Sequence, residues 1–257
     1  VIPLINLVDL SVVPLRLHQA GFSTAEATSL YGQLTGMANS VIQFPVLLTI
    51  ALAMSLVPAI SEAQALKSTA LIHERTGLAM RVTLFFAIPS SLGLFILARP
   101  TTLVLFDNMG ASYPLAVLSL YTATSGILQG LGRTMDPVKN MLLGAVIKFV
   151  LSWVLTAMPA LHVGGAAFST VAGFSIASFF NIRKVSVLTG WRFSFRELLF
   201  KPLVAAFFMS WGVLLSAGLL APFFSSFISE RLAGGLLLTV EILLGLIIYV
   251  LVLILVG

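Results

Sequence analysis

The placement of charge around long apolar runs is the feature that most constrains what this chain can fold into. The sequence is 59% hydrophobic and only 9% charged, and its apolar runs reach the length of roughly 20 residues that a membrane-spanning helix needs. If the gaps between these runs are numbered in order, most of the 14 Lys and Arg residues fall in the even gaps. Because basic residues collect on the cytoplasmic side of membrane proteins, the pattern predicts repeated crossings with the odd gaps outside.

The even gaps hold most of the basic side chains and the odd gaps few. The basic residues of the even gaps are Lys67, Arg75, Arg81, Arg133, Lys139, Arg183, Lys184, Arg192, Arg196 and Lys201. The odd gaps contribute Arg16, Arg99 and Arg231, and Lys148 lies inside an apolar run. This distribution predicts that the residue 1 end and the C-terminus both lie on the cytoplasmic side of the membrane.

Eight apolar segments fit as membrane helices. Because lipid offers no water to the backbone, each span must satisfy its own hydrogen bonds as a helix, and the runs lack the alternation of membrane β-strands. The fold class expected is therefore all-α and polytopic. The expected helices are 1–17, 30–59, 80–98, 113–131, 140–158, 164–182, 202–220 and 232–256.

Several classes of function have no support in the composition. Cysteine is absent, which excludes disulfides, thiol catalysis and Cys-ligated metals. The three His residues show no metal-binding spacing, and no phosphate-binding loop is present. Since the basic residues flank spans instead of forming one stripe, nucleic acid is not an expected partner. We expect neither an enzyme nor a bound cofactor, and we expect membrane lipids around the chain.

The first expected span begins in a stretch that is already apolar. It reads VIPLINLVDL, without Met, a basic leader or a cleavage site, so it does not resemble a signal peptide. We expect this chain to be a C-terminal piece of a longer transporter. A short natural protein is the alternative.

Asp9 and Arg16 are the first candidates for a polar site at membrane depth. Asn6, Asp9 and Arg16 are spaced by three and seven residues, so one helix face can carry all three. Ionisable residues inside a span are costly and usually face a cavity. We expect a wall of a substrate cavity, with Arg16 placed to bind a phosphate. The alternative for Arg16 is an interfacial position with its side chain extended toward water.

Lys148 is the second candidate, because it interrupts the apolar run NMLLGAVIKFVLSWVLTAM. Ser152 and Thr156 follow at successive steps of four and extend a polar stripe. A buried ammonium needs a partner, and Asp9 is the expected one by charge. Extension of the lysine toward the cytoplasm is the alternative.

Two further groups of polar residues fall inside expected spans. Asn39, Ser40 and Gln43 precede Pro45 and could either bind a sugar or bridge helices. Glu241 is the one acid within 232–256, where it could serve a cavity or a helix contact.

Several segments together resemble a known family. They are VDLSVVPLRLHQAGFSTAEATSLYGQLTGMA, FPVLLTIALAMSLVPAISEA, IPSSLGLFILARP, TSGILQGLGRTMDPVKN, and the Lys148 region with GGAAFST. In this order they resemble the stage V sporulation protein B group of bacterial polysaccharide exporters. That group is related to the MurJ-type lipid II flippases and the Wzx-type flippases of the multidrug/oligosaccharidyl-lipid/polysaccharide exporter superfamily.

The resemblance carries expectations about architecture and cargo. Family members have fourteen helices in two lobes, which makes residues 1–257 the C-terminal lobe, with the N-terminal lobe absent from this chain. The resemblance implies movement of an undecaprenyl-diphosphate-linked sugar, lipid II or a related cell-wall or spore-cortex precursor, by alternating access. The implied partners are that lipid-linked oligosaccharide and the missing lobe of the same protein.

The resemblance also bears on the coupling of transport. Some relatives bind sodium through an acid on the seventh helix and polar groups on the eleventh and twelfth helices. Asp9 matches the acid, and Ser152 and Thr156 lie near the expected ligands on the eleventh helix. Lys148 departs from that pattern, because its ammonium could occupy the place of the cation. Coupling to sodium, to protons or to the membrane potential stays open at this point.

The residues expected to form the substrate cavity are Asp9, Arg16, Asn39, Gln43, Lys148 and Ser152. Two other functions compete with the flippase. A drug or cation antiporter of the same superfamily would need acids in its cavity, which Arg16 and Lys148 argue against. A membrane glycosyltransferase or polymerase subunit would need an acidic constellation on a large loop, and the outer gaps offer only Glu26, Asp107 and Glu230.

Overall fold

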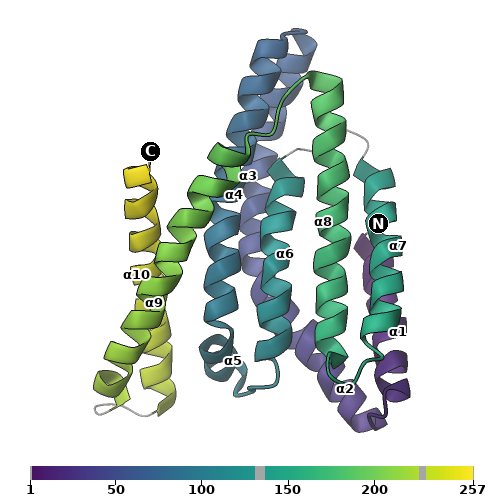
Figure 1. Ribbon diagram of the computed structural model, residues 1–257, viewed down its shortest axis with the longest axis vertical. Coiled ribbons are helices and arrows are strands. Elements are labelled where there is room, and N and C mark those ends of the chain that lie inside the picture. Colours follow the sequence, from purple (N-terminus) through teal and green to yellow (C-terminus); the bar gives the residue numbers. More distant parts are fainter. Residues whose placement is uncertain (1, 131–136, 226–229, 257) are drawn as a thin grey trace.

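The computed structural model describes residues 2–130, 137–225 and 230–256, and within these ranges the chain forms helices and no strand. Most of the helices run side by side, up and down along the long axis (Figure 1). Arg133 and residue 131, the last residue of the fourth expected helix, lie outside the described residues, as do residues 1 and 257.

The element bounds are as follows. The first half contains α1 (Ile2–Gln19), α2 (Thr24–Gly32), the π-helix η1 (Gln33–Ala38), α3 (Asn39–Ala65), α4 (Thr69–Ile96), α5 (Ala98–Phe106) and α6 (Ser112–Gly130). The second half contains α7 (Pro137–Leu155), α8 (His162–Thr189), the π-helix η2 (Arg196–Phe200), α9 (Lys201–Ser225) and α10 (Glu230–Val256).

Five helical segments among the described residues are long and apolar enough to cross a membrane. They are Thr24–Leu52, Thr69–Ile96, His162–Val187, Arg196–Leu220 and Leu232–Val256. Large apolar side chains on the last two point outward, including Leu219 at 78% and Leu255 at 83% exposure, as a surface that faces lipid requires. The protein is an all-α, polytopic membrane protein.

The second helix is longer than the range 30–59 suggested. The hydroxyl of Ser23 accepts a hydrogen bond from the backbone N–H of Glu26, whose carboxylate accepts one from the backbone N–H of Ser23. This capping box starts the helix early, and α2, η1 and α3 then follow one another without a break to Ala65. Pro45 lies inside α3 without ending it.

The polar stretch 61–80 forms helical extensions of α3 and α4. The two helices meet at a turn around Lys67, which has a positive φ of 49°. Ser68 then caps α4 by accepting a hydrogen bond from the backbone N–H of Leu71. This hairpin is the highest part of the molecule in Figure 1.

The directions of the helices agree with the charge pattern. The turn after α3, which carries Lys67, and the segment after α8, which carries Arg192, lie at the upper end of the molecule (Figure 1). Helix α10 ends on that side, and α1 runs away from it. Arg16 and Arg99 lie at the opposite end, near the last turn of α1 and the first turn of α5.

The two larger of three apolar clusters join most of the described helices. One joins α1, α2, η1, α3, α6 and α8 around Leu17, Ile42 and Leu115, which are fully buried. The other joins α4, α8, α9 and α10 around Leu84 and Tyr249. The α9–α10 pair lies beside the other helices, next to α4 and α5 (Figure 1).

Candidate functional site

A polar cavity of about 290 Å³ lies among the helices of the first cluster and α7. It is lined by charged, amide, hydroxyl and aromatic side chains at membrane depth. The lining residues are Asp9, Tyr31, Leu34, Thr35, Asn39, Gln43, Leu118, Tyr121, Lys148, Thr170 and Phe174. Four of the residues expected from the sequence therefore share this polar cavity, namely Asp9, Asn39, Gln43 and Lys148.

An ion pair between Asp9 and Lys148 forms one wall of the polar cavity. Nζ of Lys148 donates to Oδ2 of Asp9 over 2.6 Å. The Lys148 side chain is 3% exposed and the Asp9 side chain 17% exposed. The second carboxylate oxygen of Asp9, Oδ1, is buried and accepts no hydrogen bond from the residues described. The pair thus neutralises two charges inside the helical bundle and leaves acceptor capacity at the polar cavity.

A close approach of α7 to α8 positions Lys148. A Cβ added at Gly173 would lie 2.6 Å from the carbonyl oxygen of Gly144 and 3.1 Å from Cβ of Lys148. Glycine at both positions lets the two backbones touch. Because Lys148 lies one turn after Gly144, its side chain leaves α7 beside this contact and extends toward α1.

The opposite wall of the polar cavity carries residues that were not expected to belong to it. Tyr31, Thr35, Asn39 and Gln43 recur at steps of four along α2, η1 and α3. In a regular α-helix each such step drifts by about 40° around the axis. The wider turn of η1, which lies between Tyr31 and Asn39, offsets part of that drift and keeps the four side chains on one wall. Their four-residue spacing was the signal that could have identified Tyr31 and Thr35.

Arg16 does not line the polar cavity. Its Nε donates to the carbonyl oxygen of Trp153 over 2.7 Å, and its guanidinium lies 4.6 Å from the centre of the Trp153 ring. Trp153 belongs to the last turn of α7, where carbonyls lack partners within the helix. Arg16 also donates to the side chain of Gln19. It therefore joins the C-terminal ends of α1 and α7, away from the polar cavity.

Ser152 and Thr156 lie deeper in the protein than the polar cavity. Both are fully buried on α7, and neither hydroxyl makes a hydrogen bond with the residues described. They continue the face of α7 that carries Lys148, but neither is among the residues lining the polar cavity. Of the three oxygen-bearing residues expected to hold a cation, namely Asp9, Ser152 and Thr156, only Asp9 therefore lines the polar cavity.

The comparisons with known proteins identify the family. Stage V sporulation protein B of Bacillus subtilis (strain 168) is 32% identical over 182 residues, which cover 68% of this chain and 35% of that protein. The chain belongs to the stage V sporulation protein B family. This result confirms the resemblance drawn from the motifs.

Two further proteins are similar to this chain at lower identity. The lipid II flippase MurJ of Bacillus subtilis (strain 168) is 28% identical over 185 residues, 67% of this chain and 34% of that protein. Sporulation protein YkvU of the same organism is 26% identical over 200 residues, 72% of this chain and 45% of that protein. No protein-family model matches the chain. The matched regions span less than half the length of each of these relatives.

Proposed function

We propose that this chain is part of a flippase that moves a lipid-linked saccharide across the cytoplasmic membrane by alternating access. The cargo proposed is lipid II or a related cell-wall or spore-cortex precursor carried on undecaprenyl diphosphate. The observation that carries the proposal is the Asp9–Lys148 pair in the polar cavity. The name of one relative, a lipid II flippase, supports the same class of cargo.

The chemistry of the polar cavity suits a diphosphate with attached sugars. Such a headgroup cannot cross hydrocarbon without compensation for its lost hydration. The ammonium of Lys148 has three N–H donors and gives one to Asp9, which leaves two for phosphate oxygens. The amides of Asn39 and Gln43 can bind sugar hydroxyls. The lipid chain can stay in the bilayer beside the protein, and the process requires no covalent chemistry.

The proposed orientation places both ends of the chain on the cytoplasmic side. The basic side chains at the upper end of Figure 1 then face the cytoplasm, in keeping with the positive-inside rule. The other lobe of the same protein would cover the polar cavity and alternate its access.

Coupling is proposed to run without a sodium ion beside Asp9. The ammonium of Lys148 already supplies the positive charge that balances this carboxylate. A sodium ion would have to displace it against a 2.6 Å charge-assisted contact. The membrane potential or a proton gradient is then the driving force we propose.

Complementation of a strain depleted of its own lipid II flippase tests the proposal. The complete gene would be expressed as the wild type and with Lys148→Met, Asp9→Asn or Lys139→Met. Lys139→Met is the matched control, because it removes an exposed lysine from the same helix. We expect rescue by the wild type and by Lys139→Met, and loss of rescue for the other two variants at equal membrane levels.

Two outcomes of the complementation test would contradict parts of the proposal. If the well-expressed wild type fails to rescue, lipid II is not the cargo, and another lipid-linked polysaccharide takes its place. If Lys148→Met rescues as well as Lys139→Met, the ion pair has no part in transport.

The competing functions fit the polar cavity less well. A cation antiporter needs an acid free to exchange its counter-ion, and the one acid lining the polar cavity, Asp9, is held by Lys148. An enzyme would need a nucleophile or base arranged for chemistry. The relatives are named as a flippase and as sporulation proteins, which supports transport over catalysis.

A further inference from the structure

A row of polar or small residues follows α7, with one member at every fourth position. The members are Asn140, Gly144, Lys148, Ser152 and Thr156, and they are referred to below as the α7 row. Thr156 follows the last residue of α7, and its backbone N–H still donates to the carbonyl oxygen of Ser152 over 3.1 Å. Because side chains four residues apart form a continuous ridge on a helix, the α7 row follows the helix from end to end.

The two hydroxyls at the C-terminal end of the α7 row lack the partners that such groups ordinarily have. A Ser or Thr inside a helix commonly donates to a carbonyl oxygen one turn earlier, as Thr83 does to that of Ala79 over 2.8 Å. The hydroxyls of Ser152 and Thr156 are fully buried and have no hydrogen-bond partner among the described residues. Burial of a polar group without a partner is unfavourable. Two such hydroxyls one turn apart therefore indicate a partner that does not belong to the described parts of the chain.

The same face of α7 leads from these hydroxyls to the ion pair. Lys148 lies one turn before Ser152 and donates to Oδ2 of Asp9. Oδ1 of Asp9 is buried and accepts no hydrogen bond from the described residues. Unpartnered oxygens thus occur on Asp9, Ser152 and Thr156, from the ion pair to the C-terminal end of α7.

The spacing of these oxygens suits bound water. Positions four residues apart lie about 6 Å apart along a helix, and two hydrogen bonds of about 2.8 Å through one water span nearly that distance. Each hydroxyl can both donate and accept, so it can link a water on either side. Past Thr156, the residues Met158, Pro159 and Ala160 are exposed. A short file of water would therefore join the ion pair to solvent.

The α7 row is closed on the other side of Lys148. A Cβ added at Gly144 would lie 2.5 Å from the carbonyl oxygen of Gly173, so the backbones of α7 and α8 touch there. A cavity of about 10 Å³ beside this contact has room for one water at most. One turn before Gly144, the amide of Asn140 donates to Oδ1 of Asn181 over 2.6 Å and joins the two helices again. A continuous file along α7 can therefore leave the ion pair only toward Ser152.

We propose that the α7 row binds a file of water that carries protons between the C-terminal end of α7 and the Asp9–Lys148 pair. The file passes Thr156 and Ser152 and ends at Oδ1 of Asp9. At that end, an O–H bond of a protonated water breaks, its proton forms an O–H bond with the carboxylate, and a neutral water remains. The reverse transfer returns the proton to the file.

The groups around the file leave Asp9 as its proton acceptor. The other charged or titratable groups near its two ends are Arg16 on α1, Tyr31 on α2, Tyr121 on α6 and His162 on α8. Arg16 donates to the Trp153 carbonyl. Of the described residues that line the polar cavity, Asp9 is the one with a carboxylate.

The role of the file in transport rests on the proposed function, but its existence does not. In the orientation proposed above, the file opens on the outer side, so protons reach Asp9 without crossing the space that holds the cargo. Proton exchange along the file requires no lipid-linked saccharide. A measurement of exchange therefore fails or succeeds independently of the flippase proposal.

Hydrogen exchange at single thiols tests the file. Because these 257 residues contain no cysteine, Ser152→Cys, Thr156→Cys and Thr83→Cys each introduce one thiol. The complete protein, with any cysteine outside these residues replaced, would be reconstituted in vesicles and transferred to D₂O, and infrared absorption would follow the conversion of S–H to S–D. Thr83→Cys is the matched control, since Thr83 is equally buried but belongs to α4 and has a hydrogen-bond partner.

We expect the thiols at positions 152 and 156 to exchange at least about tenfold faster than the thiol at 83, which exchanges only when the helix packing opens. Adding Thr156→Val to Ser152→Cys should slow exchange at 152 by about tenfold or more, because the hydroxyl that links the waters is lost. Adding Thr83→Val or Thr156→Ser should leave that exchange fast, since each keeps the hydroxyl at 156.

Three results would overturn the proposal. Equal exchange at positions 152 and 83 would show that the α7 row is dry. Fast exchange at 152 in the presence of Thr156→Val would show that water arrives from the polar cavity. Slow exchange with Thr156→Ser as well would assign the effect to packing instead of the hydroxyl.

Complementation of the depleted strain tests the role of the file in transport. We expect Thr156→Ser to rescue growth as the wild type does and Thr156→Val to rescue it less well at equal membrane levels. Full rescue by Thr156→Val, together with slowed exchange at position 152, would overturn that role.

Discussion

Asp9 and Glu241 are both acids within apolar helices, but only Asp9 has a counter-charge among the described residues. The Asp9 side chain is 17% exposed and receives the ammonium of Lys148 at 2.6 Å. Glu241 is 2% exposed, and no described residue gives it a counter-charge. The burial of an acid in this protein therefore does not tell whether another residue of the chain supplies its counter-charge.

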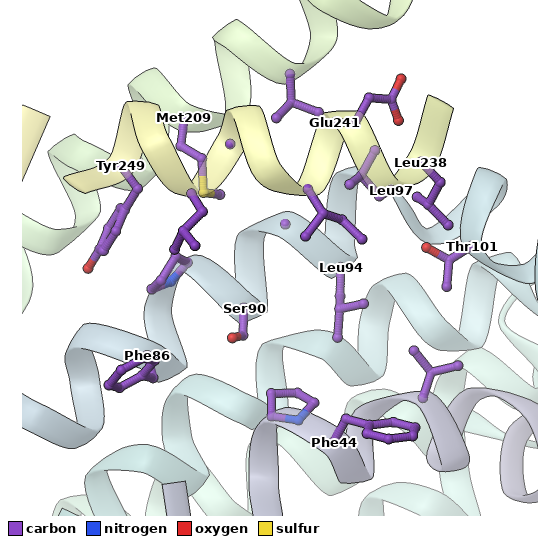
Figure 2. Close-up of a pocket in the computed structure, with 18 of the residues that line it drawn as sticks. Phe44, Phe86, Ser90, Leu94, Leu97, Thr101, Met209, Leu238, Glu241 and Tyr249 are labelled. Atoms are coloured by element: carbon purple, nitrogen blue, oxygen red, sulfur yellow. The ribbon is translucent and has the colours of Figure 1, made fainter. Parts of the chain in front are cut away.

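The surroundings explain the difference. In the polar cavity, amides and hydroxyls accompany the ion pair, so the region is neutral overall and able to bind polar groups. Around Glu241, α10 packs between apolar helices, and its carboxylate lies on the α9 side of α10 (Figure 2). Removing the partner of Asp9 and replacing Glu241 itself should therefore have effects of opposite sign on the free energy of unfolding.

Loss of the lysine should have the largest effect. Lys148→Met leaves the Asp9 carboxylate buried without its partner, and we expect it to lower the free energy of unfolding by about 3–5 kcal/mol. Asp9→Asn combined with Lys148→Met should restore much of this loss, because neither charge then remains. Thermal unfolding followed by tryptophan fluorescence measures both variants.

Lys139→Met is the reference for that series. We expect it to change the unfolding temperature little, because its side chain is exposed. A double variant no more stable than Lys148→Met would show that the ion pair is not the cause of the loss.

Removal of the other acid should stabilise the protein. Glu241→Met replaces an unpartnered polar group with an apolar side chain of similar length, and we expect a gain of about 1–3 kcal/mol. The same unfolding assay measures it, with Glu197→Gln, which removes an exposed carboxylate that pairs with Arg81, as the control. A loss of stability would mean that Glu241 has a partner within the intact protein, which would remove the contrast between the two acids.

Loss of the contact between the C-terminal ends of α1 and α7 should lower the free energy of unfolding by less. Arg16→Met removes one hydrogen bond to the Trp153 carbonyl and the contact with its ring, and we expect a loss of about 1 kcal/mol. Arg99→Met is a matched control at the same end of the molecule. Because Arg16 lies outside the polar cavity, Arg16→Met should still rescue the depleted strain. Loss of rescue at normal membrane levels would show that Arg16 takes part in transport.

Sodium should have the smallest effect. Exchange of choline chloride for sodium chloride at constant ionic strength should not change the unfolding temperature, because Lys148 already balances Asp9. A rise with sodium in the wild type that disappears in Asp9→Asn would show that the cation binds beside this acid after all.

Much of the fold was predictable because hydropathy and charge are local properties. The long apolar runs predicted an all-α, polytopic protein, and the motifs predicted its family. The start of α2 was missed because a capping box acts through two side chains, Ser23 and Glu26, which a search for apolar runs does not register.

The candidate site was predictable in part. Asp9 and Lys148 could be matched by charge, although 139 positions separate them. The position of Arg16 could not be foreseen, because it depends on how α1 lies against the last turn of α7. The shared wall of Tyr31 and Gln43 depends on η1, and a π-helix has no strong sequence signature. The apolar cavity of about 580 Å³ beside α9 and α10 arises from the packing of these helices against α3, α4 and α5, which no local pattern specifies.

The long separation between Asp9 and Lys148 also has a consequence for how the protein is made. The ribosome synthesises α1 well before α7. The Asp9 carboxylate therefore has no counter-charge until Lys148 on α7 has been made. An intermediate that contains α1 without α7 carries an unneutralised acid and should be recognisable to membrane quality control. Formation of this one contact therefore marks the point in synthesis at which the first and seventh helices can no longer be separated without penalty.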